Sequence, residues 1–383
     1  MVVYALSIVV FVFAVIAVEY YFYFLLFRFG WNHNLTFVLS PAKNKFGYPN
    51  IISLREGMTS NNTLNPPAGK TFDVLCNHVV YNRTSWNKYM PKDTLYVGIL
   101  REPYEFFKSC LNYMRPGYVF NKIKSSQPGS EFLKDPLKYE PKSSIMSFTN
   151  NRMAVEFGCP DELVKSLDKQ KIIEFVQQID TDFGMVIIAE HFEESVVLLR
   201  RYMKWSTKDI IYLDKNIALK KNSTKLVGPY DRQLYKRFAK IDYALYEHFY
   251  RKLREQIRNE GYDYDDELLH YKEVRKMAVE FCGPGKDPIA KLSVKESKWS
   301  DGFDITYDEC LLLKKGEITF VQDIRFRQYG SREIWTCIYY TLLLVDICMW
   351  LPYVCGYHAY VVAICMWLYK EQNLVFELCN QHS

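Results

Sequence analysis

Two uninterrupted apolar stretches lie toward the two ends of the chain, and between them short apolar runs alternate with amphipathic segments. Short apolar runs are typical of buried strands, whereas apolar residues spaced three and four positions apart indicate helices. The middle of the chain therefore predicts strands at Phe72–Cys76, Thr94–Leu100, Met185–Ala189 and Ile210–Leu213. It predicts helices at Tyr104–Met114, Glu193–Met203 and Arg232–Ile257. Strands separated by helices favour an α/β fold with a parallel sheet that helices cover.

The amino-terminal apolar stretch predicts a membrane segment. From Met1 to Phe27 the only charged residue is Glu19, and a spanning helix needs roughly 20 apolar residues. The aromatic run Tyr20–Phe24 is typical of a membrane interface. We expect residues 1–27 to be a signal anchor. The alternative is a cleaved signal peptide, which normally has a charged start and a small-residue cleavage site.

The second apolar stretch, residues 335–369, carries only Asp346 as a formal charge. It predicts a membrane hairpin, one irregular span or a buried tail, and an altered gene product is a further explanation. No low-complexity linker divides residues 28–334, which we expect to form one domain. Residues 370–383 would then be a tail.

Composition limits the chemistry that the chain can perform. Its 383 residues are 49% hydrophobic, which is enough for a large core. The formal net charge of +5 suits an anionic ligand, but no dense basic stripe with interleaved aromatic residues indicates a nucleic-acid partner. No CxxC pair or HExxH motif supports a metal site.

Cysteines and sequons both bear on the compartment. The ten cysteines divide evenly between residues 28–334 and the carboxyl-terminal part of the chain, and the first five are Cys76, Cys110, Cys159, Cys282 and Cys310. An odd number in a luminal domain implies at least one free or intermolecular thiol. The pairing cannot be read from the sequence. Asn34, Asn61, Asn82 and Asn222 begin N-glycosylation sequons, which favours a luminal domain.

One strand–helix junction suggests a phosphate site. The predicted strand Thr94–Leu100 runs directly into Arg101, and Ser109 follows in the next helix. Ligands of α/β proteins bind at the carboxyl ends of the strands. An arginine fork and a serine hydroxyl there are suited to a terminal phosphate. The alternative is a surface arginine beside a small buried residue.

The segment TFDVLCNHVVYNRTSWNKYMPKDTLYVGILREPYEFFKSCLNYM, residues 71–114, resembles the galactose 3-O-sulfotransferases. In that family a strand ends in Cys-Asn-His, and Leu-Arg-Asp/Asn-Pro begins the 3′-phosphate site of the donor, 3′-phosphoadenosine 5′-phosphosulfate (PAPS). Further segments resemble the family in the same order, namely LLFRFGWNHNLTFVLS with FGYPN, NRMAVEFG, VIIAEHFEESVVLLRRYMKWSTKDIIYL and ECLLLKKGEITF.

The resemblance implies a PAPS-dependent sulfotransferase of the P-loop type that transfers a sulfuryl group to the 3-hydroxyl of galactose. Arg101 and Ser109 would bind the donor, and His78 would be the general base. The alternative for His78 is a histidine that only hydrogen-bonds a loop. Glu190 is a second polar group at the end of a strand, and its alternative is a helix-capping or ion-pair role. The resemblance also implies a single-pass type II protein of the Golgi membrane and an acceptor on a glycolipid, such as galactosylceramide, or on a glycoprotein.

The sequence departs from the family at the 5′-phosphosulfate loop. The family has Lys-Thr-x-Lys-x-(Gly/Ala)-Ser-Ser-Thr before the helix that corresponds to LLFRFG, whereas VFAVIAVEYYFYF stands here. Losing two or three charge-assisted hydrogen bonds to the donor would cost roughly 3–9 kcal/mol. Two alternatives therefore stay open: a relative that only binds the acceptor, and a polytopic membrane protein without catalysis.

Overall fold

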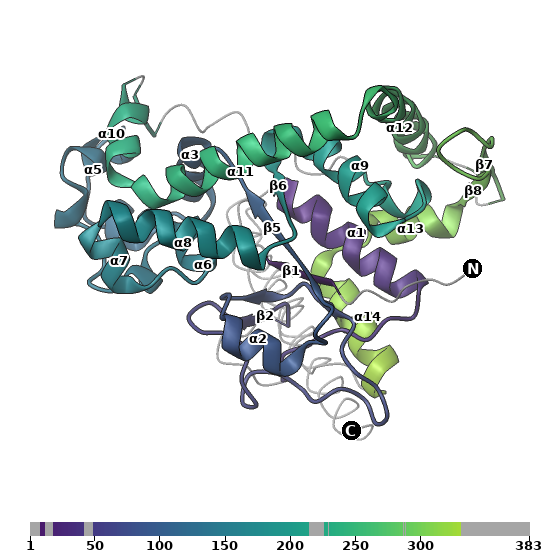
Figure 1. Ribbon diagram of the computed structural model, residues 1–383, viewed down its shortest axis with the longest axis horizontal. Helices are drawn as coiled ribbons and strands as arrows, with labels where there is room; N and C mark the ends of the chain where they lie inside the picture. The colour runs from purple at the N-terminus through teal and green to yellow at the C-terminus, as the bar shows by residue number, and fades with distance from the viewer. Residues whose placement is uncertain are drawn as a thin grey trace, which may run out of the picture.

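A computed structural model describes residues 8–11, 18–41, 49–213, 226–228, 230–285, 287 and 289–330. Within these ranges the chain forms a mixed α/β fold with small sheets (Figure 1). The largest is a four-stranded sheet in the order β3 (Val74–Leu75), β1 (Ile8–Phe11), β5 (Leu95–Leu100) and β6 (Met185–Ile188). Its neighbouring strands are all parallel, so their carboxyl ends share one edge.

Two groups of helices flank this sheet in Figure 1. One group comprises α1 (Val18–Asn32), α9 (Phe192–Met203), α12 (Tyr262–Phe281), α13 (Tyr307–Lys314) and α14 (Glu317–Tyr329). The other comprises α3 (Pro103–Tyr113), α4 (Gly117–Phe120), α5 (Pro128–Lys134), α6 (Arg152–Glu156), α7 (Asp161–Ser166), α8 (Lys169–Asp182) and α10 (Asp231–Phe238). The long helix α11 (Lys240–Asn259) runs across the top of the view between them.

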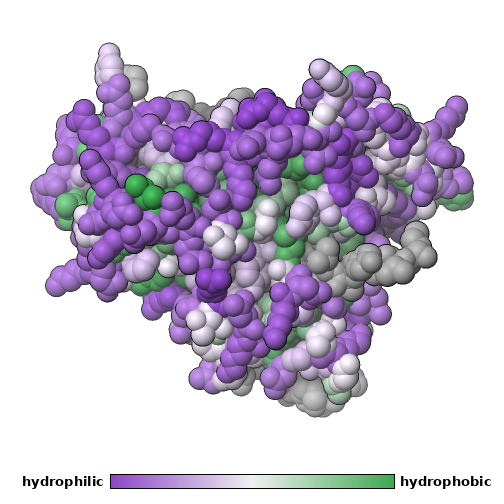
Figure 2. Space-filling model, in the orientation of Figure 1, coloured by the Kyte–Doolittle hydropathy of each residue, from purple (hydrophilic) through white to green (hydrophobic). Residues whose placement is uncertain are grey.

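Two small sheets complete the described elements. The parallel pair of β2 (Ile51–Ser53) and β4 (His78–Val79) lies near α2 (Arg83–Tyr89), and the antiparallel pair of β7 (Lys291–Val294) and β8 (Phe303–Thr306) lies beyond α12. The face shown in Figure 2 is mostly hydrophilic, with small separate hydrophobic patches. The large apolar side chains of the described helices therefore point mainly inward.

The prediction of membrane segments at the ends is wrong for the described part of the amino-terminal stretch. Ile8–Phe11 is a strand of the main sheet, with β3 on one side and β5 on the other. Val18–Asn32 is helix α1, and its residues from Tyr21 to Phe29 are buried in the core. A helix that is apolar all round suits a protein core as well as a bilayer. Among the described helices, none has the length and apolar character to cross a membrane. Residues 335–369 lie outside the described ranges.

The other predicted elements differ from the structure in three places. The predicted strand at Phe72–Cys76 is reduced to β3, and Ile210–Leu213 is no strand but follows a short 3₁₀ turn. The predicted helix Arg232–Ile257 is divided into α10 and α11 at Ala239. The strands at Thr94–Leu100 and Met185–Ala189, like the helices at Tyr104–Met114 and Glu193–Met203, lie within one or two residues of the prediction.

The break between α10 and α11 has a cause that lies far away in the chain. Asn151, in a left-handed conformation with φ of 48°, accepts hydrogen bonds at Oδ1 from the backbone N–H groups of Ile241 and Asp242, at 2.8 and 3.1 Å. Asp242 in turn accepts at Oδ1 from the N–H of Ala154 in α6, at 2.7 Å. The Asn151 side chain thus accepts from backbone N–H groups at the start of α11, and the Asp242 side chain accepts from one in the first turn of α6. These N–H groups have no hydrogen-bond partner within their own helices.

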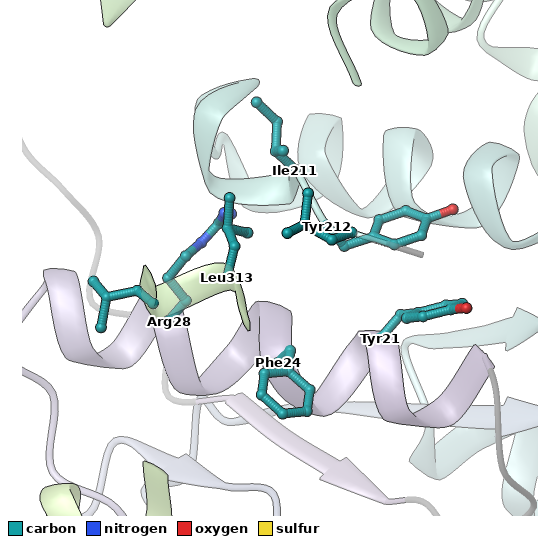
Figure 3. A pocket seen from close by; sticks show the side chains of 8 residues that line it. Tyr21, Phe24, Arg28, Ile211, Tyr212 and Leu313 are labelled. Atoms are coloured by element: carbon teal, nitrogen blue, oxygen red, sulfur yellow. The ribbon is translucent and has the colours of Figure 1, made fainter. Parts of the chain in front are cut away.

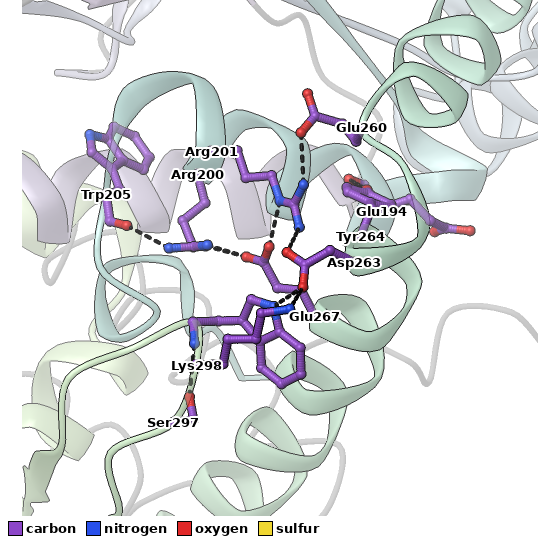
Figure 4. A network of polar contacts seen from close by, with 11 residues as sticks. Glu194, Arg200, Arg201, Trp205, Glu260, Asp263, Tyr264, Glu267, Ser297 and Lys298 are labelled. Carbon is purple, nitrogen blue, oxygen red and sulfur yellow. Dashed lines mark hydrogen bonds and ion pairs between the residues drawn. The ribbon is translucent and has the colours of Figure 1, made fainter.

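An ionic network joins α9 to α12 (Figure 4). Arg200 and Arg201 both donate to Glu267, whose side chain is only 3% exposed. Arg201 also pairs with Glu260 and Asp263, at 2.8 and 3.0 Å. Two guanidinium groups surround the buried carboxylate of Glu267. Its negative charge is therefore paired, which offsets the cost of removing a charge from water. The segment LLRRYMKW therefore has a structural role.

A disulfide bond joins Cys282, just after α12, to Cys310 in α13. Cys76, Cys110 and Cys159 are buried and form no disulfide bond within the described residues. The prediction that at least one of these five cysteines has no disulfide partner is confirmed for this part of the chain. The bond joins the end of α12 to α13, on the two sides of the segment that contains β7 and β8.

We expect stability to depend on pH through Asp242. Complete burial raises the pKa of Asp242 from 3.8 to about 7. A carboxyl with a raised folded-state pKa stabilises the fold below its unfolded pKa, near 4, and this contribution is lost as pH rises through 7. Asp242→Asn keeps the acceptor for Ala154 and removes the ionisation. The free energy of unfolding of the wild type, relative to this variant, should fall by up to about 4 kcal/mol between pH 4 and 8.

Chemical denaturation at several pH values measures this difference. Asp266→Asn removes the same charge from an exposed position on α12 and should leave the slope of the wild type unchanged. A wild type and an Asp242→Asn variant with parallel pH profiles would show that Asp242 is not buried as a neutral acid.

Candidate active site at the carboxyl edge of the sheet

Three of the four parallel strands lead at their carboxyl ends to a polar residue. β3 leads through Cys76 and Asn77 to His78, β5 leads to Arg101, and β6 leads to Glu190. Between β3 and β5, strand β1 leads into residues 12–17, which lie outside the described ranges. Side chains from segments far apart in the sequence are therefore collected at one edge, where α/β proteins bind ligands.

Arg101 and Ser109 lie on the β5–α3 unit. Arg101 directly follows Leu100, the last residue of β5, and Ser109 lies within α3. Both side chains are partly exposed, and neither has a hydrogen bond or ion pair with any residue that the structure describes. A guanidinium group with no protein partner at the end of a central strand is available to an anionic ligand.

The acidic residues beside Arg101 are engaged with the protein. Glu102 caps α3 by accepting from the N–H of Glu105, and its carboxylate also accepts from the Tyr243 hydroxyl and pairs with Arg232. Burial and the Glu102 carboxylate raise the pKa of Tyr243, so its hydroxyl remains a donor at neutral pH.

Glu190 is tied to the start of α3. Its Oε1 accepts from the backbone N–H of Glu102 at 3.0 Å, and its Oε2 accepts from the Tyr246 hydroxyl at 3.4 Å. Of the roles that the sequence left open for Glu190, these contacts favour the structural one, because the side chain holds the β6 end against α3.

His78 lies in a buried polar cluster beside α1. The Tyr23 hydroxyl is 3.1 Å from Nδ1, and Oε1 of Glu317 is 3.8 Å from Nε2. The His78 backbone N–H donates to the carbonyl of Asn50, where β4 pairs with β2. His78 is only 8% exposed. The histidine predicted from the Cys-Asn-His segment thus has a fixed position near the carboxyl end of β3.

Asn77 closes the turn before His78. Its side-chain N–H donates to the carbonyl of Val38 at 3.0 Å, which joins the β3 end to the segment after α1. Its Oδ1 is buried and has no hydrogen-bond partner among the described residues. The hydrogen bond to the Val38 carbonyl therefore gives Asn77 a structural role.

A small pocket lies on the other side of α1 (Figure 3). Tyr21, Phe24 and Arg28 of α1 face Ile211, Tyr212 and Leu313 across it. Its volume is about 10 Å³, which is roughly the space of one water molecule. The guanidinium of Arg28 donates to the carbonyls of Lys208 and Asp209, and burial lowers its pKa to about 10. This pocket is too small for a nucleotide or a sugar.

The model of one protein family, galactose-3-O-sulfotransferase, matches residues 10–290, which is most of the chain. This chain belongs to the galactose-3-O-sulfotransferase family. The match begins within β1, so the described edge of the sheet falls inside the family domain, apart from Glu317.

Curated relatives agree with this assignment. Galactose-3-O-sulfotransferase 2 of Mus musculus is 30% identical over 242 residues, which cover 62% of this chain and 59% of that protein. Galactose-3-O-sulfotransferase 3 of Mus musculus is 26% identical over 319 residues, 77% and 72% of the two chains. The galactosylceramide sulfotransferase of Homo sapiens is 26% identical over 230 residues, 59% and 52%. The first alignment thus spans less than two thirds of that relative. No solved structure gives a significant match.

The departure from the family falls at the β1–α1 junction. The residues between these elements, 12–17, read Val-Phe-Ala-Val-Ile-Ala and contain no lysine, serine or threonine. In the sulfotransferase pattern, this junction supplies the cations and hydroxyls for the 5′-phosphosulfate. The strand and the helix on each side of it are present.

Sequence reasoning missed Tyr23 and Glu317, which contact His78. Tyr23 falls in the run that we interpreted as a membrane anchor, and Glu317 falls in the late segment ECLLLKKGEITF, far from His78 in the chain. The one signal for Glu317 was its place in a segment that resembles the family. In the described ranges, no three His, Cys, Asp or Glu side chains are arranged to hold a metal ion.

Proposed function

We propose that this protein transfers a sulfuryl group from PAPS to the 3-hydroxyl of galactose on a glycolipid or a glycoprotein glycan. Family membership and the printed names of the relatives support this reaction class. The observation that carries the proposal is the β5–Arg101–α3–Ser109 unit, in which a cation with no hydrogen-bond or ion-pair partner among the described residues stands at the carboxyl end of a central strand.

The donor half of the proposed site comprises Arg101 and Ser109. Arginine offers two parallel N–H donors that match two oxygens of a terminal phosphate, and a serine hydroxyl adds a third donor. The 3′-phosphate distinguishes PAPS from ordinary adenine nucleotides, so these contacts would also provide selectivity. No metal ion is required for this binding.

The acceptor half comprises the surroundings of His78. A sugar hydroxyl is a weak nucleophile at neutral pH, and a base that takes its proton contributes roughly 10²–10⁴ in rate. His78 stands at the end of β3, next to β1 and close to α1, beside the junction where the family holds the phosphosulfate. We propose that His78 takes part in removing the proton of the sugar hydroxyl.

We further propose that the protein functions in the Golgi lumen. Three sequon asparagines, Asn34, Asn61 and Asn82, are exposed, and Cys282 and Cys310 form a disulfide bond. Disulfides persist in the secretory pathway and are rare in the cytosol. Both features support a luminal protein.

The donor site is tested by nucleotide binding. Adenosine 3′,5′-bisphosphate should raise the melting temperature of the protein, whereas adenosine 5′-phosphate should raise it less at equal concentration. Arg101→Ala should weaken binding of the bisphosphate about 10-fold to 100-fold, because a charge-assisted pair is lost. Arg251→Ala, an exposed arginine on α11, is the control and should keep the full shift. Equal shifts by both nucleotides would contradict the assignment of Arg101 to the 3′-phosphate.

The junction between β1 and α1 should limit turnover. Replacing residues 12–17 with a loop of the family form, Lys-Thr-x-Lys-x-Gly-Ser-Ser-Thr, should raise sulfate transfer from labelled PAPS to a β-galactoside by about 10²-fold or more. In that variant His78→Ala should lower kcat and leave the affinity for adenosine 3′,5′-bisphosphate nearly unchanged. An unaltered chain as active as the replaced one would mean that other groups neutralise the phosphosulfate.

Glycosylation tests the compartment. Protein made in a secretory system should carry N-glycans at Asn34, Asn61 and Asn82, and glycosidase treatment should increase its electrophoretic mobility. Asn82 caps α2 through Oδ1, and a glycan on the side-chain nitrogen leaves that oxygen in place. Asn222 is a sequon outside the described ranges. Single Asn→Gln variants should each remove one step of the mobility change, and a protein that shows no change would argue against a luminal domain.

A further inference from the structure

Three distant segments meet at His78. Tyr23 comes from α1, His78 from β4 and Glu317 from the first residue of α14. The Tyr23 hydroxyl is 3.1 Å from Nδ1 of His78, and Oε1 of Glu317 is 3.8 Å from Nε2. The tyrosine is only 3% exposed, so it closes the inner side of the histidine ring. Glu317 stands on the other side.

The carboxylate of Glu317 is held in place at one oxygen. Oε1 accepts a hydrogen bond from the side-chain N–H of Asn50 at 2.8 Å, and the same oxygen faces His78. Oε2 has no hydrogen bond or ion pair with any residue in the described ranges. The side chain of Glu317 is 18% exposed, compared with 10% for His78. Oε2 is therefore the accessible proton acceptor of this cluster.

The partners of His78 favour one tautomer. A phenol hydroxyl donates readily and an ionised carboxylate only accepts. Nδ1 can accept from the Tyr23 hydroxyl only when the proton of the neutral ring is on Nε2. The Glu317 carboxylate, 3.8 Å from Nε2, is too far for a hydrogen bond but favours a proton on that nitrogen electrostatically. We assign the neutral ring to this tautomer from its partners. In this state Nε2 carries a proton, so it cannot take another from a substrate, whereas Glu317 can.

We propose that Glu317 is a further catalytic residue, whose Oε2 accepts the proton of the acceptor hydroxyl while Asn50 holds the carboxylate at Oε1 beside His78. This inference rests on the proposed function. The sugar O–H bond breaks toward Glu317, and the freed electron pair forms the new bond from oxygen to sulfur. The bond from sulfur to the phosphate oxygen breaks, and adenosine 3′,5′-bisphosphate leaves with that electron pair. Glu317, now protonated, later returns the proton to water.

Nuclear magnetic resonance of the full chain tests the pairing without any turnover. With ¹⁵N-labelled histidine, and His78→Gln to identify the signals, His78 should show the Nε2–H tautomer. Among the described residues, the ionisable groups that face this cluster include Tyr23 on α1, Glu317 on α14 and Cys76, whose thiol pKa is raised by burial and by the Glu317 charge. In Glu317→Gln the ring nitrogen signals should move at a fixed pH, because the nearby negative charge is lost. Glu273→Gln, an exposed site on α12, should match the wild type.

Sugar binding tests the contact with the acceptor. The unchanged chain should bind methyl β-galactoside about tenfold more tightly than its 3-deoxy analogue, because the 3-hydroxyl donates to an ionised carboxylate. Glu317→Gln should bind the two sugars nearly equally, and Glu273→Gln should keep the tenfold preference. Thermal unfolding of each variant shows whether it is folded.

The outcomes separate this inference from the proposed function. If the unchanged chain binds galactoside but Glu317→Gln keeps the preference for the 3-hydroxyl, Glu317 does not contact the acceptor and the inference is overturned, although the proposed function stands. If the His78 signals are the same in Glu317→Gln and the wild type, the pairing is absent. If neither sugar binds to the unchanged chain, the proposed acceptor site itself fails.

Discussion

The position of β1 in the sheet is the constraint on which the rest of the structure depends. Ile8–Phe11 is hydrogen-bonded to β3 on one side and to β5 on the other, so β1 connects the strand that leads to His78 with the strand that leads to Arg101. The helix that follows, α1, is buried from Tyr21 to Phe29 and provides Tyr23 to the histidine. The donor half and the acceptor half of the proposed site are therefore held at a fixed separation by β1, which pairs with the strand that leads to each half.

Hydropathy could not reveal this role. A run of apolar residues satisfies the interior of a bilayer and the interior of a protein equally well, and the choice depends on whether other strands offer hydrogen-bond partners. Those partners, β3 and β5, lie far along the chain. β5, β6, α3 and α9 could be predicted because polar or turn residues bound each apolar pattern locally. Ile210–Leu213 looked like a strand, but its carbonyl at Ile210 accepts from the Tyr271 hydroxyl instead of from a neighbouring strand.

The same distinction applies to the candidate site. Arg101, Ser109 and His78 could be named from the sequence because each belongs to a short local pattern of strand, turn and helix. Glu317, Tyr23 and Asn50 could not, since their relation to His78 exists only after α1, β4 and α14 have packed together. Asn151 and Asp242 are a structural example of the same kind. Their reciprocal capping interrupts a helix that the local pattern predicts to be continuous.

The electrostatics of the sheet edge explain how this fold can lose a loop and remain folded. Arg101 stands beside Glu102 and Glu190, and Arg232 is already paired with Glu102 and Glu105, so the described edge holds little positive charge beyond Arg101. In the family pattern, lysines at the β1–α1 junction balance the donor's phosphosulfate. The neighbouring elements β1 and α1 are held instead by strand pairing and apolar burial, neither of which needs those lysines. An apolar junction can therefore stand in the place of the charged loop at little cost to the fold, while donor binding, as we propose it, would depend mainly on Arg101. Stability and function are separable at this junction because they rest on different interactions.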